Sequence, residues 1–152
     1  MAEYTLLYIL FAPFAGAILL LFVSNRRPLQ VRLVAAGSSF VSLLASAYLF
    51  YAYDPVKGGF QFIQRFEWSK ELGIAFYLGV DGIGTPLVLA SCILLFAGVF
   101  ISWHIKDRIK EFYIFLLILA AATIGVFMCL DLFFLYFFYE MSVLPMYLLL
   151  GV

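Results

Sequence analysis

Five long apolar runs, separated by short polar connections, organise this chain. Each run is close to the roughly 20 residues that an α-helix needs to cross the ~30 Å hydrocarbon core of a bilayer. The charged residues are concentrated in the connections, apart from one acid in the last run. The pattern therefore predicts five membrane-spanning helices, at residues 4–23, 33–53, 83–103, 112–130 and 132–152.

The connection between the second and third runs follows a different, two-residue period. It opens with Asp54-Pro55, which ends a helix, and two glycines that favour a turn. Apolar and polar residues then roughly alternate in two stretches around residues 69–73, which predicts a β-hairpin over residues 60–80. We expect one face of the hairpin to be aromatic and to pack on a neighbour or on lipid headgroups; its residues are Phe60, Phe62, Phe66 and Trp68.

Composition points to the same class of protein. Hydrophobic residues make up 66% of the chain and charged residues 12%, with a mean hydropathy of +1.12, so there is too little polar surface to coat a soluble globule. The expected fold class is an all-α integral membrane protein, with the lipid bilayer as a partner. Zero net charge gives no indication of a nucleic-acid partner. The first run lacks the basic start of a signal peptide, so we expect it to remain as a helix.

Two further patterns concern packing and orientation. The second run has a face of small residues suited to close helix packing: Gly37, Ser38, Ser39, Ser42, Ala45 and Ser46. The first and third connections hold six Lys and Arg residues, Arg26, Arg27, Arg32, Lys106, Arg108 and Lys110, against three in the second, Lys57, Arg65 and Lys70. The positive-inside rule then predicts that the N-terminus and the hairpin lie outside.

Glu140 is the acid inside the fifth run, which contains no basic residue. It lies about 12 Å along the predicted helix, near the middle of the membrane. Because a charge at that depth costs at least ~2.5–3.5 kcal/mol, the carboxylate should face protein or water, or meet a cation on another helix. Pro145 cannot donate a hydrogen bond to the Met141 carbonyl, which favours a bend beside the acid. The pair is a candidate site for holding and moving a proton.

Three other polar residues are weaker candidates. Asp81, where the third helix begins, is expected to cap that helix, with direct proton transfer as the alternative. His104 follows the same helix and is expected to be an interfacial side chain, with a proton relay as the alternative. Asp131 marks the tight turn into the fifth helix. We expect Cys92 and Cys129 to be buried, reduced thiols.

No pattern in the chain indicates a cofactor or a metal. A Gly-rich phosphate loop between a strand and a helix is missing, as is a cysteine cluster for zinc or iron–sulfur. A single histidine also excludes a bis-His haem within this chain. Transport, or coupling to a transporter, is the class of function that remains.

Three stretches resemble a known family. The run FYEMSVLPMYLLLGV at 138–152 looks like the signature around the mid-membrane glutamate of the antiporter-like, proton-pumping subunits of respiratory complex I. The form Glu-Met-x-x-x-Pro-Met-Tyr resembles chain M (subunit 4) more than its two sister subunits. Two further stretches support the resemblance, YLGVDGIGTPLVLAS at 77–91 and IGVFMCLDLFFLYFFYE at 124–140. It is strong over 80–152 and rests on layout alone for the first two helices.

The resemblance implies a subunit of about fourteen helices, of which this chain is the N-terminal part. Glu140 would be the helix-5 glutamate, which pairs with a lysine on a later helix and controls its affinity for protons. No such lysine lies in the five predicted spans, because Lys57, Lys70, Lys106 and Lys110 all fall in connections. Quinone reduction would take place elsewhere in the enzyme, with no cofactor in this chain.

The resemblance also implies partners and a location. The partners are the remaining C-terminal helices of the same subunit and other membrane-arm subunits, including sister antiporter-like subunits. The expected location is an energy-transducing membrane, and a bacterial inner membrane fits best. Two alternatives stay open. One is the equivalent subunit of a multi-subunit Na⁺/H⁺ antiporter or membrane-bound hydrogenase, and the other is a truncated structural or assembly element.

Overall fold

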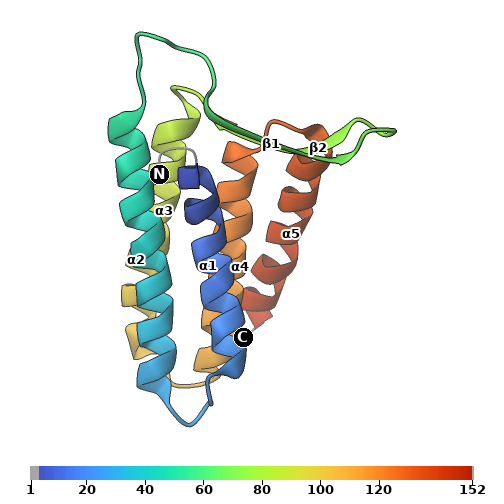
Figure 1. The fold of residues 1–152 in the computed structure, drawn as a ribbon. Helices are drawn as coiled ribbons and strands as arrows, with labels where there is room; N and C mark the ends of the chain where they lie inside the picture. Colours follow the sequence, from blue (N-terminus) through green and yellow to red (C-terminus); the bar gives the residue numbers. More distant parts are fainter. Residues whose placement is uncertain (1–3, 152) are drawn as a thin grey trace.

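The computed structural model describes residues 4–151 and is a bundle of long helices with a small β-hairpin across one end (Figure 1). The helices are α1 (Thr5–Phe22), α2 (Pro28–Ala52), α3 (Gly84–Ile101), α4 (Ile109–Met128) and α5 (Leu132–Gly151). The strands β1 (Gln61–Ser69) and β2 (Ile74–Val80) precede α3, and a short 3₁₀ helix, η2 (Ser102–His104), follows it. These five helices are long and apolar enough to cross a membrane. The predicted architecture of five spans and one hairpin is therefore confirmed.

Two helices begin earlier than the apolar runs predict. α2 begins at Pro28 rather than residue 33, because the fixed φ and missing N–H of proline suit the first helical position. Arg32 therefore lies inside α2 and not in the connection. α4 begins at Ile109 rather than residue 112, which places Lys110 and Glu111 in its first turn. The apolar runs therefore mark less than the full length of these two helices, because both begin with a turn that contains charged or polar residues.

Four helices form the bundle and the fifth stands at its edge. α1 packs on α2 and α4, and α3 packs on the same two helices from the other side. α5 makes its main contacts with α4 and β2 alone (Figure 1). Only 17% of its span is buried, the lowest share of the five, so α5 has most of its surface open.

Small residues allow α1 and α2 to approach closely. The α2 residues Ser39, Ser42 and Ser46 are fully buried, as the small-residue face predicts. Gly16 of α1 lies against Ser38, and an added Cβ there would come within 2.6 Å of the Ser38 Cβ. Gly37 does not belong to this face, since nothing lies within 4 Å of its Cβ position.

A serine of α2 compensates for a proline in α1. Pro13 lies inside α1 and has no N–H to donate to the Ile9 carbonyl one turn earlier. The Ser42 hydroxyl donates to that carbonyl instead, over 3.1 Å, in a buried position. Because an unpaired carbonyl is costly in an apolar interior, this contact stabilises the turn before Pro13 and joins the two helices.

The hairpin is antiparallel, but its faces differ from the predicted ones. Gln61 pairs with Val80 and Gln64 with Leu78, so two residues of β1 lie opposite one residue of β2. The bulge includes Phe62, whose φ is +57°. It shifts the alternation so that Gln61 and Gln64 share a face with Leu78 and Val80. The prediction of one aromatic face running from residue 60 to residue 68 is wrong for this reason.

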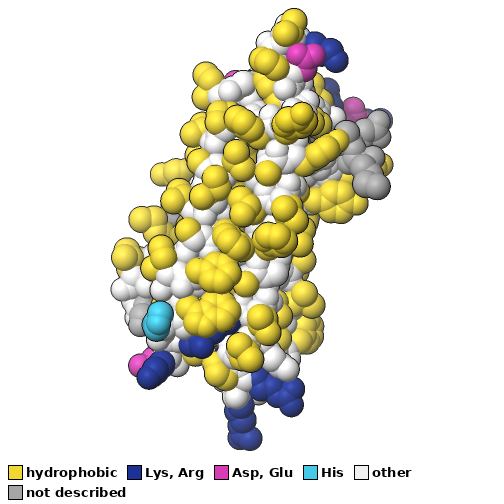
Figure 2. Space-filling model, turned by 90° about the vertical axis from the view of Figure 1, so that its left-hand side faces the viewer, with side chains coloured by type: hydrophobic (Ala, Val, Ile, Leu, Met, Phe, Trp, Pro, Cys, Tyr) yellow, Lys and Arg dark blue, Asp and Glu magenta, His cyan; other side chains and the backbone are white. Residues whose placement is uncertain are grey.

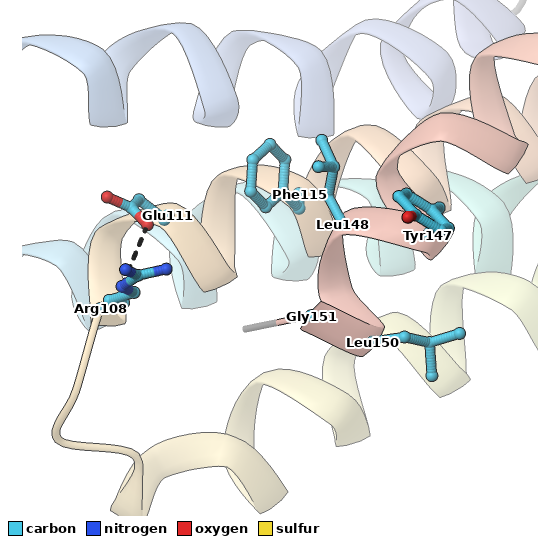
Figure 3. Close-up of a pocket in the computed structure, with 7 residues that line it drawn as sticks. All are labelled: Arg108, Glu111, Phe115, Tyr147, Leu148, Leu150 and Gly151. Atoms are coloured by element: carbon cyan, nitrogen blue, oxygen red, sulfur yellow. Dashed lines mark ion pairs between the residues drawn. The ribbon is translucent and has the colours of Figure 1, made fainter.

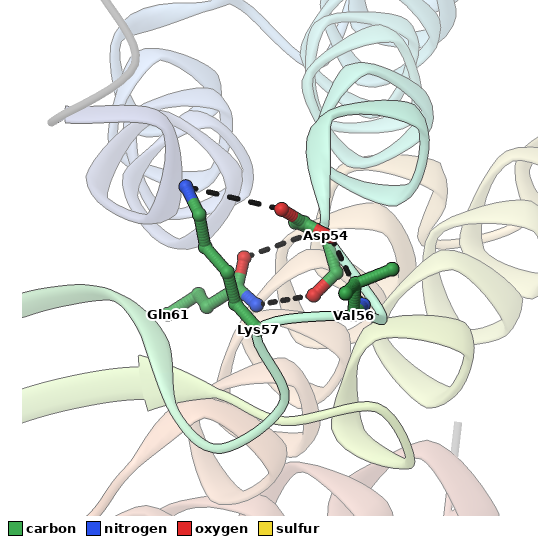
Figure 4. A network of polar contacts seen from close by, with 4 residues as sticks. All are labelled: Asp54, Val56, Lys57 and Gln61. Atoms are coloured by element: carbon green, nitrogen blue, oxygen red, sulfur yellow. Dashed lines mark hydrogen bonds and ion pairs between the residues drawn. The ribbon is translucent and has the colours of Figure 1, made fainter.

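The connection from α2 to β1 is held by a small polar network (Figure 4). The Asp54 carboxylate accepts the Val56 N–H at 2.9 Å and lies 3.8 Å from the Lys57 ammonium. The Gln61 side chain both accepts the Asp54 N–H and donates to the Asp54 carbonyl, at 3.1 Å and 2.6 Å. These bonds fix the start of β1 relative to the end of α2.

Candidate functional site

Asp131 starts the helix that carries the candidate acid. Its carboxylate accepts the N–H groups of Phe133 and Phe134, at 2.9 Å and 3.3 Å, which is the geometry of an N-cap. Its other oxygen accepts the Ala75 N–H from β2 at 3.3 Å. One side chain therefore caps α5 and joins it to the hairpin.

The hairpin lies on the turn between α4 and α5. The Leu130 N–H donates to the Tyr77 carbonyl at 2.8 Å, and Leu78 forms a bridge with Cys129. The ring of Phe76 meets that of Phe134 edge to face, with the ring centres 5.2 Å apart. The expectation that the hairpin packs on a neighbour is confirmed, with the start of α5 as that neighbour.

The buried face of α5 is aromatic and fits against a glycine of α4. Phe134 and Phe138 are 6% and 4% exposed and point into the bundle. An added Cβ at Gly125 would lie 2.8 Å from the ring of Phe138, so only glycine leaves room for that ring. This seam fixes the rotation of α5 about its own axis.

Glu140 follows Phe138 by two residues and therefore lies on the opposite side of α5. It is exposed. Among residues 4–151 no cation forms an ion pair with it, and the group that interacts with its carboxylate is the Tyr136 hydroxyl one turn earlier. Sequence analysis missed Tyr136, although the spacing of four residues on a helix could have identified it.

Pro145 lies on the buried side of the same helix. α5 continues through it to Gly151 without interruption. The Met141 carbonyl loses its usual donor, as the Ile9 carbonyl does at Pro13. The described residues offer no side-chain donor to the Met141 carbonyl comparable to the Ser42 hydroxyl at Ile9. Pro145 thus removes one regular backbone hydrogen bond close to Glu140 in the chain.

The structure places the two remaining candidates outside this site. Asp81 accepts the Gly84 N–H at 2.6 Å, and its carbonyl accepts the Thr85 N–H at 3.0 Å, which are the contacts of a residue that starts α3. His104 ends η2 and is exposed at the opposite end of the bundle (Figure 2). Neither residue is brought near Glu140 by the described part of the chain. Direct proton transfer by either one stays an untested alternative.

The cysteines are buried and free, as expected. Burial raises the pKa of the Cys129 thiol, which lies in the turn between α4 and α5, so it stays protonated near neutral pH. Within residues 4–151, no group of three or more His, Cys, Asp or Glu side chains could hold a metal ion.

A cavity of about 480 Å³ opens beside the far end of α5 (Figure 3). Tyr147, Leu148 and Leu150 line it from α5, and Phe115 lines it from α4. The pair of Arg108 and Glu111, 3.9 Å apart, lies at its polar edge. α5 thus packs tightly on α4 near Gly125 and leaves space beside it near the other end of the bundle.

Comparison with known proteins identifies relatives over nearly the whole chain. "NADH-quinone oxidoreductase subunit M" of Rhodobacter capsulatus is 35% identical over 148 residues, which are 95% of this chain and 28% of the relative. "NADH-ubiquinone oxidoreductase chain 4" of Arabidopsis thaliana is 33% identical over 145 residues, 95% of this chain and 29% of the relative. The "NAD(P)H-quinone oxidoreductase chain 4-2" of a Synechocystis strain is 32% identical over 138 residues, which are 90% of this chain and 25% of the relative. The chain is a homologue of the subunit M/chain 4 family.

The match covers only a small part of each relative's length. This chain spans less than a third of the length of these relatives. No protein-family model matches it. The family resemblance inferred from the three sequence stretches is confirmed by the relatives' names.

Proposed function

We propose that this chain is part of a proton-translocating membrane subunit of an NADH:quinone oxidoreductase, and that Glu140 is its proton-coupling acid. The names of the relatives, which are subunits of NADH-quinone and NADH-ubiquinone oxidoreductases, support the class of enzyme. In this proposal the redox reaction takes place in other subunits, and this chain provides a protonatable group inside the membrane. Its partners are the further helices of the subunit and neighbouring membrane subunits, in an energy-transducing membrane such as a bacterial inner membrane.

The observation that carries the proposal is the position of Glu140. It lies in the interior of a membrane-length helix, on the side facing away from α4, with Tyr136 as its neighbour. A carboxylate at that depth is too costly to face lipid tails. Since no cation among residues 4–151 pairs with it, its counter-charge must come from outside this part of the chain. An acid that depends on a separate cation can respond to movement or neutralisation of that cation.

The proposed coupling is electrostatic. A carboxylate about 4–6 Å from an ammonium group favours the charged form of that ammonium. When Glu140 is drawn toward another charge or takes up a proton, the ammonium loses this stabilisation and releases its own proton. The four lysines of this chain lie outside the middle of the spans, and Lys110 in the first turn of α4 bonds the Leu21 carbonyl. The ammonium group is therefore assigned to a later helix of the same subunit.

Pro145 gives the segment after Glu140 more freedom to bend. The missing hydrogen bond weakens the turn between Met141 and Pro145. A helix that bends at this point can carry Glu140 between two neighbours without unfolding. Pro145 is thus proposed as a positioning residue.

The test is the substitution Glu140→Gln in native membranes, which removes the charge and keeps the shape. NADH-driven quinone reduction and proton uptake are measured together, with assembly of the enzyme checked on a native gel. We expect both activities to fall at least about tenfold while assembly is unchanged, since loss of a coupling acid removes a proton-transfer step. Co-purified subunits identify the enzyme as an NADH:quinone oxidoreductase or as an antiporter or hydrogenase assembly.

Two matched variants make the result specific. Glu71→Gln removes a carboxylate from the exposed hairpin turn and is expected to leave both activities unchanged. Tyr136→Phe removes the hydroxyl that interacts with Glu140 and should lower proton uptake less than Glu140→Gln does. Wild-type activities in an assembled enzyme carrying Glu140→Gln would show that the acid has a structural role only.

A further inference from the structure

A second, smaller cavity lies at the end of the bundle opposite the hairpin. It has a volume of about 210 Å³ and is bounded by the turn between α1 and α2 and by the beginning of α4. Pro28, which starts α2, is one of the residues that line it. The polar side chains in its lining are those of Asn25, Lys106, Arg108, Lys110 and Glu111. The proposed function uses none of these residues.

The charges around this cavity are unbalanced in favour of cations. Three basic side chains line it, against the single carboxylate of Glu111. That carboxylate lies 3.9 Å from the Arg108 Nε, and the Lys110 ammonium donates to the Leu21 carbonyl at 2.8 Å. Lys106 makes no ion pair or side-chain hydrogen bond with any residue in the range 4–151. The cavity therefore has a net positive charge and donors that are still available.

The position of the cavity along the bundle is that of lipid headgroups. Pro28 and Lys110 lie in the first turns of two helices that are each long enough to span a membrane. Lys and Arg side chains gather at this end, below a surface that is mainly hydrophobic (Figure 2). At the same end, the Arg32 guanidinium lies 5.7 Å from the ring centre of Trp103, and both are residue types that mark a membrane boundary.

We propose that this cavity binds the phosphate of an anionic phospholipid headgroup. Its volume is below the ~300 Å³ typical of pockets for drug-sized ligands, so it suits a single phosphate group with short substituents. α4 has no side-chain cap at its first turn, so its backbone N–H groups add to the field of the three cations. Basic pockets between spans are a known form of lipid recognition, and here the sequence places lysines on both sides of Arg108.

The test uses the membrane-embedded protein purified with its natural partners and placed in nanodiscs of phosphatidylglycerol and phosphatidylcholine in equal amounts. Native mass spectrometry then counts the lipids that stay bound. One double variant, Lys106→Gln with Arg108→Gln, removes two cations of the cavity and leaves the Lys110 contact with α1 in place. A matched double variant, Arg26→Gln with Arg27→Gln, removes the same charge from the same end, outside the cavity lining.

Wild-type protein is expected to retain phosphatidylglycerol over phosphatidylcholine. The cavity variant should lose this preference by roughly 25-fold, the effect of removing two cations near the surface, and the matched variant should keep most of it. Equal loss in both variants would mean a general attraction to anionic membranes and would overturn the proposal. Equal retention of the two lipids by the wild-type protein would also overturn the proposal. This comparison needs no variant, so it holds even if a variant fails to assemble. Displacement of the lipid by millimolar inorganic phosphate would assign the site to free phosphate instead.

Discussion

At the scale of single residues, the three acids Asp81, Asp131 and Glu140 have different surroundings and therefore different tasks. The first two each accept backbone N–H groups at the start of a helix. These contacts use the carboxylate to satisfy donors that the helix cannot satisfy itself. Glu140 accepts no backbone N–H and faces outward. Glu140 is therefore the one of the three whose carboxylate is not used to start a helix, which is why the proposed proton coupling is placed there.

The cap at Asp131 can be tested by comparing Asp131→Ala with Asp131→Asn. Alanine removes the acceptor for Phe133, Phe134 and Ala75, and loss of an N-cap costs about 1 kcal/mol. We expect faster amide hydrogen exchange at these three positions. Asparagine, which also caps helices, should restore most of the protection. Equal exchange in the alanine variant and the wild type would contradict the capping role.

The link between Pro13 and Ser42 predicts that stability lost in a single variant is partly recovered in a double variant. Ser42→Ala leaves the Ile9 carbonyl without a donor and should lower the free energy of unfolding by about 0.5–1.5 kcal/mol. In Pro13→Ala with Ser42→Ala, the new backbone N–H can reach the Ile9 carbonyl, so much of the loss should be recovered. Unfolding in detergent measures all four members of the cycle. Simple additivity of the two changes would show that the hydroxyl does not replace the missing N–H.

At the scale of elements, α5 is held by its first half. The hairpin and the turn from α4 fix its start, and the contact of Phe138 with Gly125 fixes its rotation. Farther along, the cavity beside Tyr147 and Leu148 separates it from α4. The same rotation that buries Phe138 turns Glu140 away from the bundle. Packing at one face therefore sets the direction of the acid at the other.

This seam predicts different effects for two glycine substitutions. Gly125→Ala would place a methyl group 2.8 Å from the Phe138 ring, and overpacking of this kind costs about 1–3 kcal/mol. Gly98→Ala, in α3, meets nothing within 4 Å and should be neutral or slightly stabilising. Thermal unfolding of the two variants measures the difference. Because α5 must shift, Gly125→Ala should also reduce the activity proposed for Glu140; equal melting temperatures would mean that the seam is not tight.

At the scale of the whole molecule, the two ends of the bundle differ. One end carries the hairpin with its aromatic residues, and the other carries most of the basic side chains (Figures 1 and 2). The helices between them are mainly apolar on their outer surface. This distribution suits a protein that spans a bilayer, and the positive-inside rule predicts that the basic end faces inward.

The predicted orientation can be tested with two single cysteine substitutions. Glu71→Cys places a thiol on the hairpin turn, and Asp107→Cys places one in the connection before α4. Both natural cysteines are buried and should react little. An impermeant maleimide added to intact cells should label the first variant alone, and the second only after permeabilisation. The reverse pattern would show that the hairpin lies inside.

The sequence by itself determined the five long helices, the hairpin and the place of an acid within the fifth helix, because hydrophobic periodicity and helix-breaking residues are local signals. It also identified Asp81 and Asp131 as residues that begin helices. Only the tertiary structure decided which way Glu140 faces, since that depends on the fit of Phe138 against Gly125, which are 13 positions apart. The sequence alone likewise did not predict the bulge that shifts the faces of β1, or the hydrogen bond from the Ser42 hydroxyl to the Ile9 carbonyl. Each depends on contacts between two different elements, and a local sequence pattern does not predict such contacts.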